Sequence, residues 1–370
     1  MINHGLQHMS LSIVNSLEEN AWREFVYHHP QGNIFHTPEM FEVFKRTKGY
    51  SPQLWASLGA QGEVLAVLPL VNITLHSGLL RRLTTRAIAY GGALSSPGAA
   101  GREGVDALLR TYFERAVNQV LFTQLRHQSD AGDIRPILEQ NGFQYEDHLN
   151  YLIDIGCSPE QLLLNIGSRT RKHIRKGLRR GKVTVEILTQ REQIEDWYNL
   201  VRLTYNLARI PLADRSLFEA TFDVLQPQGM VKFWLAKVGD FNAAASVELI
   251  YKDTIYGWYG GVDRAYASEV PGELLMWHIL KWGAENGYHV YDFGGAGKPN
   301  EKYGVRDFKA KFGGNLVCYG RDTFVPNRIL LNISTSVYKI YQKFLDRRVN
   351  RFARIIAKYS GKSILNTVNW

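Results

Sequence analysis

The spacing of apolar residues divides the chain into alternating helical and extended segments. Two helices are predicted before residue 50, and the second begins with Thr37-Pro38-Glu39, which is typical of a helix cap followed by proline in the first turn. Apolar positions then alternate over residues 52–59 and 63–75, with the turn-forming Ala60-Gln61-Gly62 between them. This pattern predicts a β-hairpin.

The second half of the chain repeats this order of elements. A long helix is predicted over residues 158–180, and three strands follow between residues 231 and 262. Each half has helices, a run of strands and a Tyr-Gly-Gly tripeptide (Tyr90-Gly91-Gly92 and Tyr259-Gly260-Gly261), followed by another helix and strand. The repetition predicts an internal duplication and an α/β (α+β) fold.

The duplication suggests a division of the chain into three parts. The first domain is expected over residues 1–155 and the second over residues 156–325. Residues 326–370 form a basic helical segment whose apolar residues share one face. We expect this segment to pack back on the first domain, with contact to an anionic membrane surface as the alternative.

Residues 288–321 combine a short apolar strand, a glycine break at Gly294-Gly295 and a concentrated group of cations. Such a combination favours a binding floor for an anionic group. A charged hairpin above ordinary core is the alternative. Lys302, Tyr303, Arg306, Lys309 and Lys311 follow the break within ten residues of one another.

Composition narrows the class of protein. The 370-residue chain is 45% hydrophobic and carries a formal net charge of +9, which favours polyanionic partners such as RNA, phosphorylated substrates or an anionic membrane. Two cysteines, Cys157 and Cys318, make neither a disulfide framework nor a metal site, as is usual in a reducing cytosol. No signal peptide or membrane span is evident, so we expect a cytoplasmic protein, at most peripheral at the inner face of the membrane.

Several catalytic motifs are absent from the sequence. It has no Walker pattern, no Gly-Xaa-Ser-Xaa-Gly and no histidine pair at metal spacing, so we expect no metal. Gly294-Gly295-Ala296-Gly297 follows a strand, but Pro299 fits no dinucleotide-binding helix. The segment 268–275 is only a degenerate version of a glycine-rich pyrophosphate loop, which weakens an acyl-CoA donor.

The predicted helix between Arg169 and Arg180 is strongly basic. No acidic residue occurs between Glu160 and Glu186, whereas a solvated helix usually mixes both signs of charge. This pattern favours contact with a polyanion, either tRNA or lipid phosphate, and no DNA partner is expected. The residues predicted to make this contact are Arg171, Lys172, Arg175, Lys176 and Arg179.

Residues 169–321 carry segments that resemble a known family. These are SRTRKHIRKGLRRGKVTVEI (168–187), LTYNLARIP (203–211), WYGGVDRAY (258–266), GELLMWHILKWGAENGYHVYDFGG (272–295) and YGVRDFKAKFGG (303–314). They resemble the Fem family of peptidoglycan-bridge aminoacyltransferases and the Fem-like acyltransferases of exopolysaccharide gene clusters. The last two segments, in this order and spacing, are the most specific, and the N-terminal half is only consistent with the family.

The resemblance implies tandem GNAT-like (acyl-CoA N-acyltransferase-like) domains. It also implies transfer of an aminoacyl group from aminoacyl-tRNA to an amine on a lipid-linked or nucleotide-linked cell-envelope precursor, with acyl-CoA as donor in the related branch. The chain departs from members with a long coiled-coil insertion, because residues 211–229 are too few and too rich in proline. It also has Lys311-Phe312-Gly313 where many members have Lys-Gly-Phe-Gly.

The resemblance also singles out residues of a transfer site. Lys309 matches a lysine at the transfer centre, where a cation stabilises the oxyanion or the ribose-phosphate end of the donor, and Phe308 would pack against the donor. A solvated strand lysine is the alternative. Replacing Lys309 with Met is expected to abolish transfer and leave the melting profile intact. Arg209 matches an arginine that binds acceptor phosphate, with a surface salt bridge as the alternative.

The remaining predicted site residues have two interpretations each. Tyr205 and Tyr259 line the acceptor groove or pack in the core. Asp292, on a buried strand, orients the attacking amine or acts as a general base, or it anchors the glycine loop by hydrogen bonds. The other residues predicted to bind substrate are Tyr303, Arg306 and Lys311.

The sequence therefore predicts an aminoacyltransferase of cell-wall biogenesis that uses aminoacyl-tRNA as co-substrate and holds no bound cofactor. Its acceptor would be an amine of a peptidoglycan or surface-polysaccharide precursor. One alternative is an acyl-CoA-dependent N-acyltransferase that acts on an amino sugar in exopolysaccharide biosynthesis. Another is a non-catalytic RNA- or lipid-binding protein.

Overall fold

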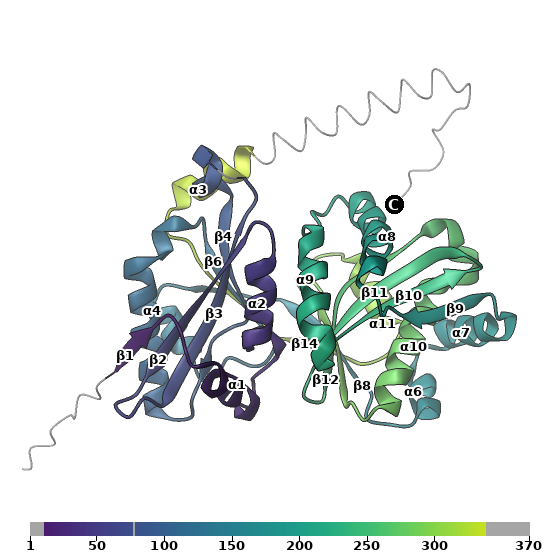
Figure 1. Ribbon diagram of the computed structural model, residues 1–370, viewed down its shortest axis with the longest axis horizontal. Helices are drawn as coiled ribbons and strands as arrows, with labels where there is room; N and C mark the ends of the chain where they lie inside the picture. Colours follow the sequence, from purple (N-terminus) through teal and green to yellow (C-terminus); the bar gives the residue numbers. More distant parts are fainter. Residues whose placement is uncertain (1–10, 77, 338–370) are drawn as a thin grey trace, which may run out of the picture.

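The computed structural model describes residues 11–76 and 78–337, which form two α/β halves side by side (Figure 1). The first half is built on a sheet with the strand order β1-β2-β3-β4-β6-β15-β7, and β5 pairs with β3. Its strands are β1 (Ser12–Val14), β2 (Tyr50–Leu58), β3 (Val64–Thr74), β4 (Thr85–Gly91), β5 (Leu94–Ser95), β6 (Thr123–His127), β7 (Gln144–Glu146) and β15 (Arg321–Phe324). Its helices are α1 (Glu19–His28), α2 (Pro38–Arg46), α3 (Arg81–Thr84), α4 (Ala99–Arg115) and α5 (Arg135–Gln140).

The second half is built on a sheet with the strand order β14-β8-β13-β12-β11-β10-β9. Its strands are β8 (Leu149–Asp154), β9 (Val183–Ile187), β10 (Val231–Val238), β11 (Phe241–Tyr251), β12 (Thr254–Val262), β13 (Val290–Gly295) and β14 (Asn315–Cys318). Its helices are α6 (Pro159–Asn165), α7 (Ser168–Arg180), α8 (Ile194–Leu207), α9 (Arg215–Leu225), α10 (Pro271–Glu285) and α11 (Gly304–Ala310). The two mixed sheets confirm the predicted fold class.

Local sequence signals explain where several elements begin. The Thr37 side chain accepts a hydrogen bond from the Met40 N–H at 3.2 Å, and Pro38 occupies the first turn of α2, as predicted. The predicted hairpin is confirmed by the antiparallel pairing of β2 with β3. In both cases the signal lies within a few neighbouring residues and depends on no distant segment of the chain.

The long helix predicted over residues 158–180 is wrong, because the chain forms α6 and α7 with a break at Ile166 and Gly167. Ile166 is extended there, and the Gly167 N–H donates to the Lys311 carbonyl at 3.1 Å. A Cβ at Gly167 would lie 3.3 Å from the same oxygen. A contact with a segment 144 positions later in the chain therefore ends the helix, and helical periodicity alone gives no sign of it.

The two halves exchange strands at both crossings of the chain. β8 precedes the boundary predicted at residue 155, yet it pairs with β13 and β14 of the second sheet. β15 precedes the boundary predicted at residue 325, yet it pairs with β6 and β7 of the first sheet. Strand pairing thus divides the chain differently from a simple cut at these two residues.

One hydrophobic cluster joins the two halves. It includes residues of α2 and β4 from the first half and of α8, α9 and β10 from the second. Phe35 is at its centre, with ring centroids 5.2 Å from Tyr90, 5.3 Å from Tyr256 and 6.2 Å from Trp258. Figure 1 shows α2 facing α9 across this contact. The two halves therefore pack on each other through a shared hydrophobic core.

The described end of the chain lies on the first half. Residues 328–337 are helical, and the Ser334 hydroxyl donates to the Leu83 carbonyl at 2.7 Å, close to α3 (Figure 1). Most of the predicted amphipathic segment, from residue 338 onward, lies outside the described residues. None of the helices in residues 11–76 and 78–337 combines the length and hydrophobicity that crossing a membrane requires.

Candidate active site

The second sheet opens between two parallel strands. β12 and β13 pair only where Thr254, Ile255 and Tyr256 oppose Val290, Tyr291 and Asp292. β12 then continues to Val262 without this partner, while the register of β13 against β8 shifts between Asp292 and Gly295. Because evenly bonded parallel strands normally continue together, this divergence opens the sheet at the carboxyl end of β13.

Gly294 makes the break in β13 possible. Its φ is +68°, a conformation that favours glycine, and a Cβ at this position would lie 2.8 Å from the Tyr256 hydroxyl oxygen. The chain therefore turns sharply at Gly294 and directs the carbonyl groups of the break towards α11.

Lys309 holds this break from α11. The lysine is 7% exposed, and its Nζ donates to the carbonyls of Phe293 at 2.6 Å, Gly294 at 3.3 Å and Gly295 at 2.8 Å. Burial lowers the pKa of Lys309 to about 8, and the nearby Asp292 carboxylate opposes this shift. All three N–H bonds of the ammonium are used, so it would have to exchange one of them to contact a reacting oxyanion.

The position of Lys309 changes two expectations. It is on a helix and buried, so the alternative of a solvated strand lysine is wrong. Removing the ammonium would leave three carbonyls and the nearby Asp292 without their cation, which is costly in a buried site. A Lys309→Met variant is therefore expected to lose stability as well, in contrast to the expectation from sequence.

Asp292 occupies the same break on the opposite side. It is 4% exposed, and its Oδ1 accepts from the Gly294 N–H at 2.6 Å, the contact expected of an anchor for the glycine loop. Burial raises the pKa of Asp292 to about 6, while the Gly294 N–H, the Lys309 ammonium and the Asn150 side chain act in the lowering direction. A carboxyl with a pKa close to neutrality suits a general base.

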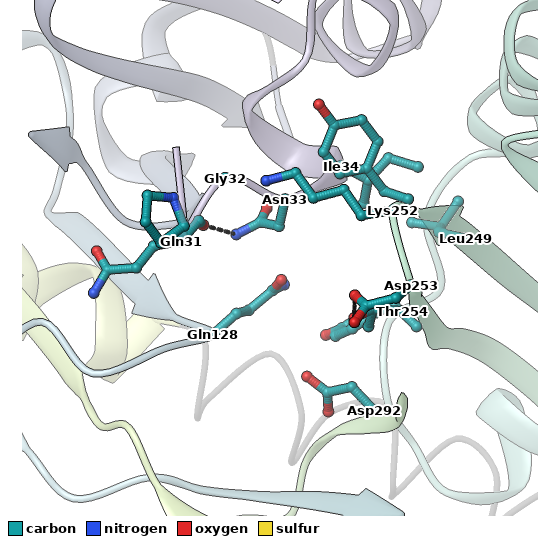
Figure 2. A pocket seen from close by; sticks show the side chains of 13 residues that line it. Gln31, Gly32, Asn33, Ile34, Gln128, Leu249, Lys252, Asp253, Thr254 and Asp292 are labelled. Carbon is teal, nitrogen blue, oxygen red and sulfur yellow. Dashed lines mark hydrogen bonds between the residues drawn. The ribbon is translucent and has the colours of Figure 1, made fainter. Parts of the chain in front are cut away.

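Asp292 also faces an open cleft between the two halves (Figure 2). In Figure 2, Asn33, Gln128 and Asp292 converge on this cleft from three separate parts of the chain. The cleft contains about 620 Å³ of empty space, which includes open solvent. Tyr256 and the β11–β12 turn at Lys252 to Thr254 form the wall on the side of the second half.

The structure brings the predicted tyrosines together. The rings of Tyr205 and Tyr259 have centroids 5.8 Å apart, and burial, reinforced by the neighbouring Tyr303, raises the pKa of the Tyr205 hydroxyl. Both rings pack at the edge of the cluster that joins the halves. The packing expected of the two rings is therefore present, and their role in the acceptor groove stays a prediction.

Arg306, Lys311 and Phe308 contact the protein itself. Arg306 donates to the carbonyls of Ala296 at 2.7 Å and Pro299 at 3.3 Å and also to that of Lys298, which fixes the loop after the glycine break. The Lys311 ammonium pairs with Glu273 at 3.3 Å.

Phe308 packs against Phe312, with ring centroids 5.3 Å apart. The substrate-binding role predicted for Arg209 stays a prediction; this residue follows α8 with a φ of +55°.

The predicted basic surface is present on α7. Ile174 and Gly177 face α10, where a Cβ on Gly177 would lie 2.7 Å from Leu274. Two members of the helix are engaged, because Arg171 donates to the Leu164 carbonyl at 2.6 Å and Arg180 pairs with Glu269 at 3.2 Å. The exposed cations of α7 that pair with no acid in the described part of the chain are Arg169, Lys172, Arg175, Lys176 and Arg179.

Glu248 is a buried acid that sequence reasoning missed. It is on β11, an interior strand of the second sheet, and is fully buried, and it accepts hydrogen bonds from the Ser246 hydroxyl and, at 2.9 Å, from the Tyr291 hydroxyl. Burial raises the pKa of Glu248 to about 7. Its neighbours in the sequence are apolar, and only the pairing of β11 with β12 and the position of Tyr291 complete this network.

Glu248 predicts a pH-dependent stability. Its folded pKa of about 7 exceeds the ordinary value of 4.5, so its contribution to stability is complete below pH 4.5 and is lost as the pH rises through 7. As the pH rises from 5 to 8, the free energy of unfolding should fall by about 2 kcal/mol less for a Glu248→Gln variant than for the unmodified protein. Urea unfolding across this range measures the difference, with the exposed Glu192→Gln as control. Parallel curves for Glu248→Gln and the unmodified protein would contradict the assignment.

No side chains in the described ranges gather as a metal site, since no three His, Cys, Asp or Glu residues lie close enough to share an ion.

Comparisons with known proteins identify similar folds. Residues 167–309 match the family model described as the acetyltransferase (GNAT) domain. The crystal structure of FemX superposes with a TM-score of 0.67 over 87% of this chain and 99% of its own, at 18% identity. No curated protein sequence matches the chain.

Two further structures share the arrangement of two halves. The C-terminal domain of a putative lysylphosphatidylglycerol synthetase from Agrobacterium fabrum superposes with a TM-score of 0.53, at 12% identity, over 87% of this chain and 95% of its own. A tandem GNAT protein from the clavulanic acid biosynthesis pathway gives a TM-score of 0.52, at 11% identity, over 86% of this chain and 99% of its own.

The class of protein follows from the two sheets, the open β12–β13 edge and these matches. The chain has the tandem GNAT fold of acyltransferases, with the matched acetyltransferase domain in its second half, as the sequence resemblance implied.

Proposed function

We propose that the protein transfers an aminoacyl group from aminoacyl-tRNA to an amine of a peptidoglycan or surface-polysaccharide precursor. The observation that carries this proposal is the glycine break of β13. There a carboxyl with a pKa of about 6 faces an open cleft, and a buried lysine holds the turn beside it. Transfer to a neutral amine needs a base of this kind, because the attacking nitrogen must lose one proton as it becomes an amide nitrogen.

The proposed step is balanced within the site. The Asp292 carboxylate takes a proton from the acceptor amine, whose nitrogen forms a bond to the carbonyl carbon of the donor ester. The bond from that carbon to the ribose oxygen breaks, and Asp292 returns its proton to the departing oxygen. Lys309 keeps the break in place during these changes and supplies the nearest positive charge.

The N-terminus of α10 favours tRNA over acyl-CoA as the donor. Pro271 begins this helix and removes one of the N–H groups that would bind a pyrophosphate. Glu273 places a carboxylate in the same first turn, where it pairs with His173 at 3.0 Å and Lys311 at 3.3 Å. Negative charge at this helix end disfavours a second anion there.

Donor consumption tests the function directly. Purified protein is incubated with an amine acceptor and either charged tRNA or labelled acetyl-CoA, and only the true donor should be consumed. Consumption of charged tRNA supports the proposal. Consumption of acetyl-CoA alone would instead identify an N-acyltransferase acting on an amino sugar. Salt-sensitive RNA or lipid binding without turnover of either donor would identify a non-catalytic binding protein.

The exposed cations of α7 predict the salt dependence of tRNA binding. Replacing Lys172, Arg175, Lys176 and Arg179 together with Gln should flatten the slope of log affinity against log salt by about 3, since each phosphate contact contributes about 0.7 to 0.9. Filter binding of tRNA between low and moderate salt measures this slope. A control carries Gln at four exposed cations of the first half: Arg46, Arg102, Arg110 and Arg115. Equal slopes for the two variants would exclude α7 as the tRNA surface.

We also infer a cytoplasmic position at the periphery of the membrane, where a lipid-linked acceptor would be reached. Leu203, Leu207 and Ile210 are 50%, 56% and 47% exposed at the end of α8. Arg202 and Arg209 are exposed among them. Apolar side chains next to cations suit an anionic membrane surface, and a nucleotide-linked acceptor would need no such contact.

A further inference from the structure

Arg126 and Arg321 face each other across two strands of the first sheet. They are direct partners in the antiparallel register of β15 with β6. The preceding residue Leu125 packs in the core of the first half, so Arg126 points to the opposite face, where Tyr90 lies beneath its guanidinium at 5.4 Å. Tyr90 packs against the cluster that joins the halves, so both arginines face the second half.

Neither arginine has a counter-ion among the described residues. Arg126 Nε donates to the Gln124 amide oxygen at 2.9 Å, and Arg321 Nη2 donates to His148 Nε2 at 2.7 Å. Glu146 is the register partner of Arg321 on β7, but its carboxylate pairs with Lys298. Like charges directly opposite on neighbouring strands are destabilising, so this pair costs stability.

His148 does not compensate for the missing anion. Burial, followed by the charges of Arg321 and Arg126, lowers the pKa of His148 to about 4, so the imidazole is neutral and accepts the Arg321 bond. Burial and the neighbouring Arg126 lower the pKa of Arg321 to about 10, which still leaves it charged at neutral pH. Two half-buried positive charges therefore lie side by side.

On the opposite face of the same two strands, the charged side chains pair with each other. There His127 on β6 pairs with Asp322 on β15 at 2.7 Å, and both side chains are almost completely buried. The same strands thus match acid with base where no ligand can reach. The face towards the second half leaves two guanidiniums without an acid.

The pair lies beside the glycine break. A Cβ at Gly295 would be 3.0 Å from His148 Nε2 and 3.7 Å from Arg321 Nη2, and the Gly295 carbonyl accepts from Lys309. Gln128, which lines the cleft, lies two residues beyond Arg126, directly after the end of β6. An anion held by the arginines would therefore lie next to the proposed transfer site.

We propose that Arg126 and Arg321 form an oxyanion-binding site that takes a phosphate or carboxylate group of the substrate. Two guanidinium groups offer the planar N–H pairs that bind such oxygens bidentately, and the anion would supply the counter-charge that the fold omits. His148 is a positioning residue that directs Arg321. That the anion belongs to a substrate of acyl transfer rests on the proposed function, whereas the site itself does not.

Anion binding by purified protein tests the site without any donor. Calorimetry and thermal melting at low salt use inorganic pyrophosphate in one arm and D-alanyl-D-alanine in the other. We expect at least one probe to bind and raise the melting temperature. Arg126→Gln and Arg321→Gln should each weaken that probe at least tenfold, while Arg102→Gln on α4, which is exposed and lies outside the site, should bind as the unmodified protein does.

The outcomes separate the possibilities. Binding of pyrophosphate alone identifies a phosphate site, and binding of the dipeptide alone identifies a carboxylate site. Without anion, both variants should melt at the same or a higher temperature, since a repulsion has been removed. Failure of both probes to bind, unchanged affinity in the two variants, or a marked loss of their stability would overturn the proposal. No acyl donor is present, so failure of acyl transfer in the donor assay leaves this result unaffected.

Discussion

Replacing Lys309 with Met is expected to reduce acyl transfer at least about 100-fold and to lower the free energy of unfolding by about 3 kcal/mol. The ammonium donates to three carbonyls of the break, and no methionine atom can replace these bonds. The loss would also leave Asp292 buried without its neighbouring cation. Steady-state transfer rates well below the melting temperature, together with urea unfolding, measure the two effects separately.

The control is Lys302→Met, a change of the same type in the same segment. Lys302 is exposed, so this variant should keep its stability and its transfer rate. Near-normal transfer by Lys309→Met would remove the lysine from the proposed site altogether. Normal stability with lost transfer would instead show that the three carbonyl bonds contribute little, and that the ammonium acts on the substrate.

Replacing Asp292 with Asn should separate activity from stability. We expect transfer to fall by about 100-fold or more, because the amide cannot accept a proton, while the Gly294 N–H still has an oxygen to bond. In the unmodified protein the rate should rise as the pH passes about 6 and then level off. This rise should be missing from the variant when kcat/KM is measured between pH 5 and 8.

The stability of the same variant follows from the direction of the pKa shift. The folded pKa of Asp292, about 6, lies above the ordinary value of 3.8, so its stabilising contribution is complete below pH 3.8 and is lost as the pH rises through 6. Asn has no such dependence, and at pH 8 the variant should unfold at the same or a higher urea concentration. Asp240→Asn, in the exposed turn between β10 and β11, serves as the control. A variant that keeps both its rate and its pH profile would exclude Asp292 as the base.

Residue types alone indicated only part of the candidate site. Burial of Asp292 followed from its position between apolar residues, because strand neighbours define the environment of a side chain. Lys309 could not be ranked among the neighbouring cations by composition, and the sequence resemblance selected it. Its contact with three carbonyls depends on the packing of α11 against the end of β13, which involves residues 14 to 16 positions away.

Arg126 and Glu248 show a second limit. Gln124 and Arg126 flank an apolar residue along β6, but nothing in the sequence says which element this polar face meets. Arg321 reaches Arg126 because β15 returns to the first sheet, 195 positions later in the chain. Glu248 forms its network with Tyr291, which is on β13, a strand distant from β11 in the sequence.

The sequence by itself determined the local features of this protein: the Thr37 helix cap, the β2–β3 hairpin, the duplicated order of elements and the basic face of α7. These depend on periodicity and turn chemistry within a few residues. Tertiary structure alone decided the break between α6 and α7, the exchange of β8 and β15 between the sheets, and the pairing of Arg126 with Arg321. Each of these arises where distant segments meet, and there backbone contacts between those segments outweigh local preference.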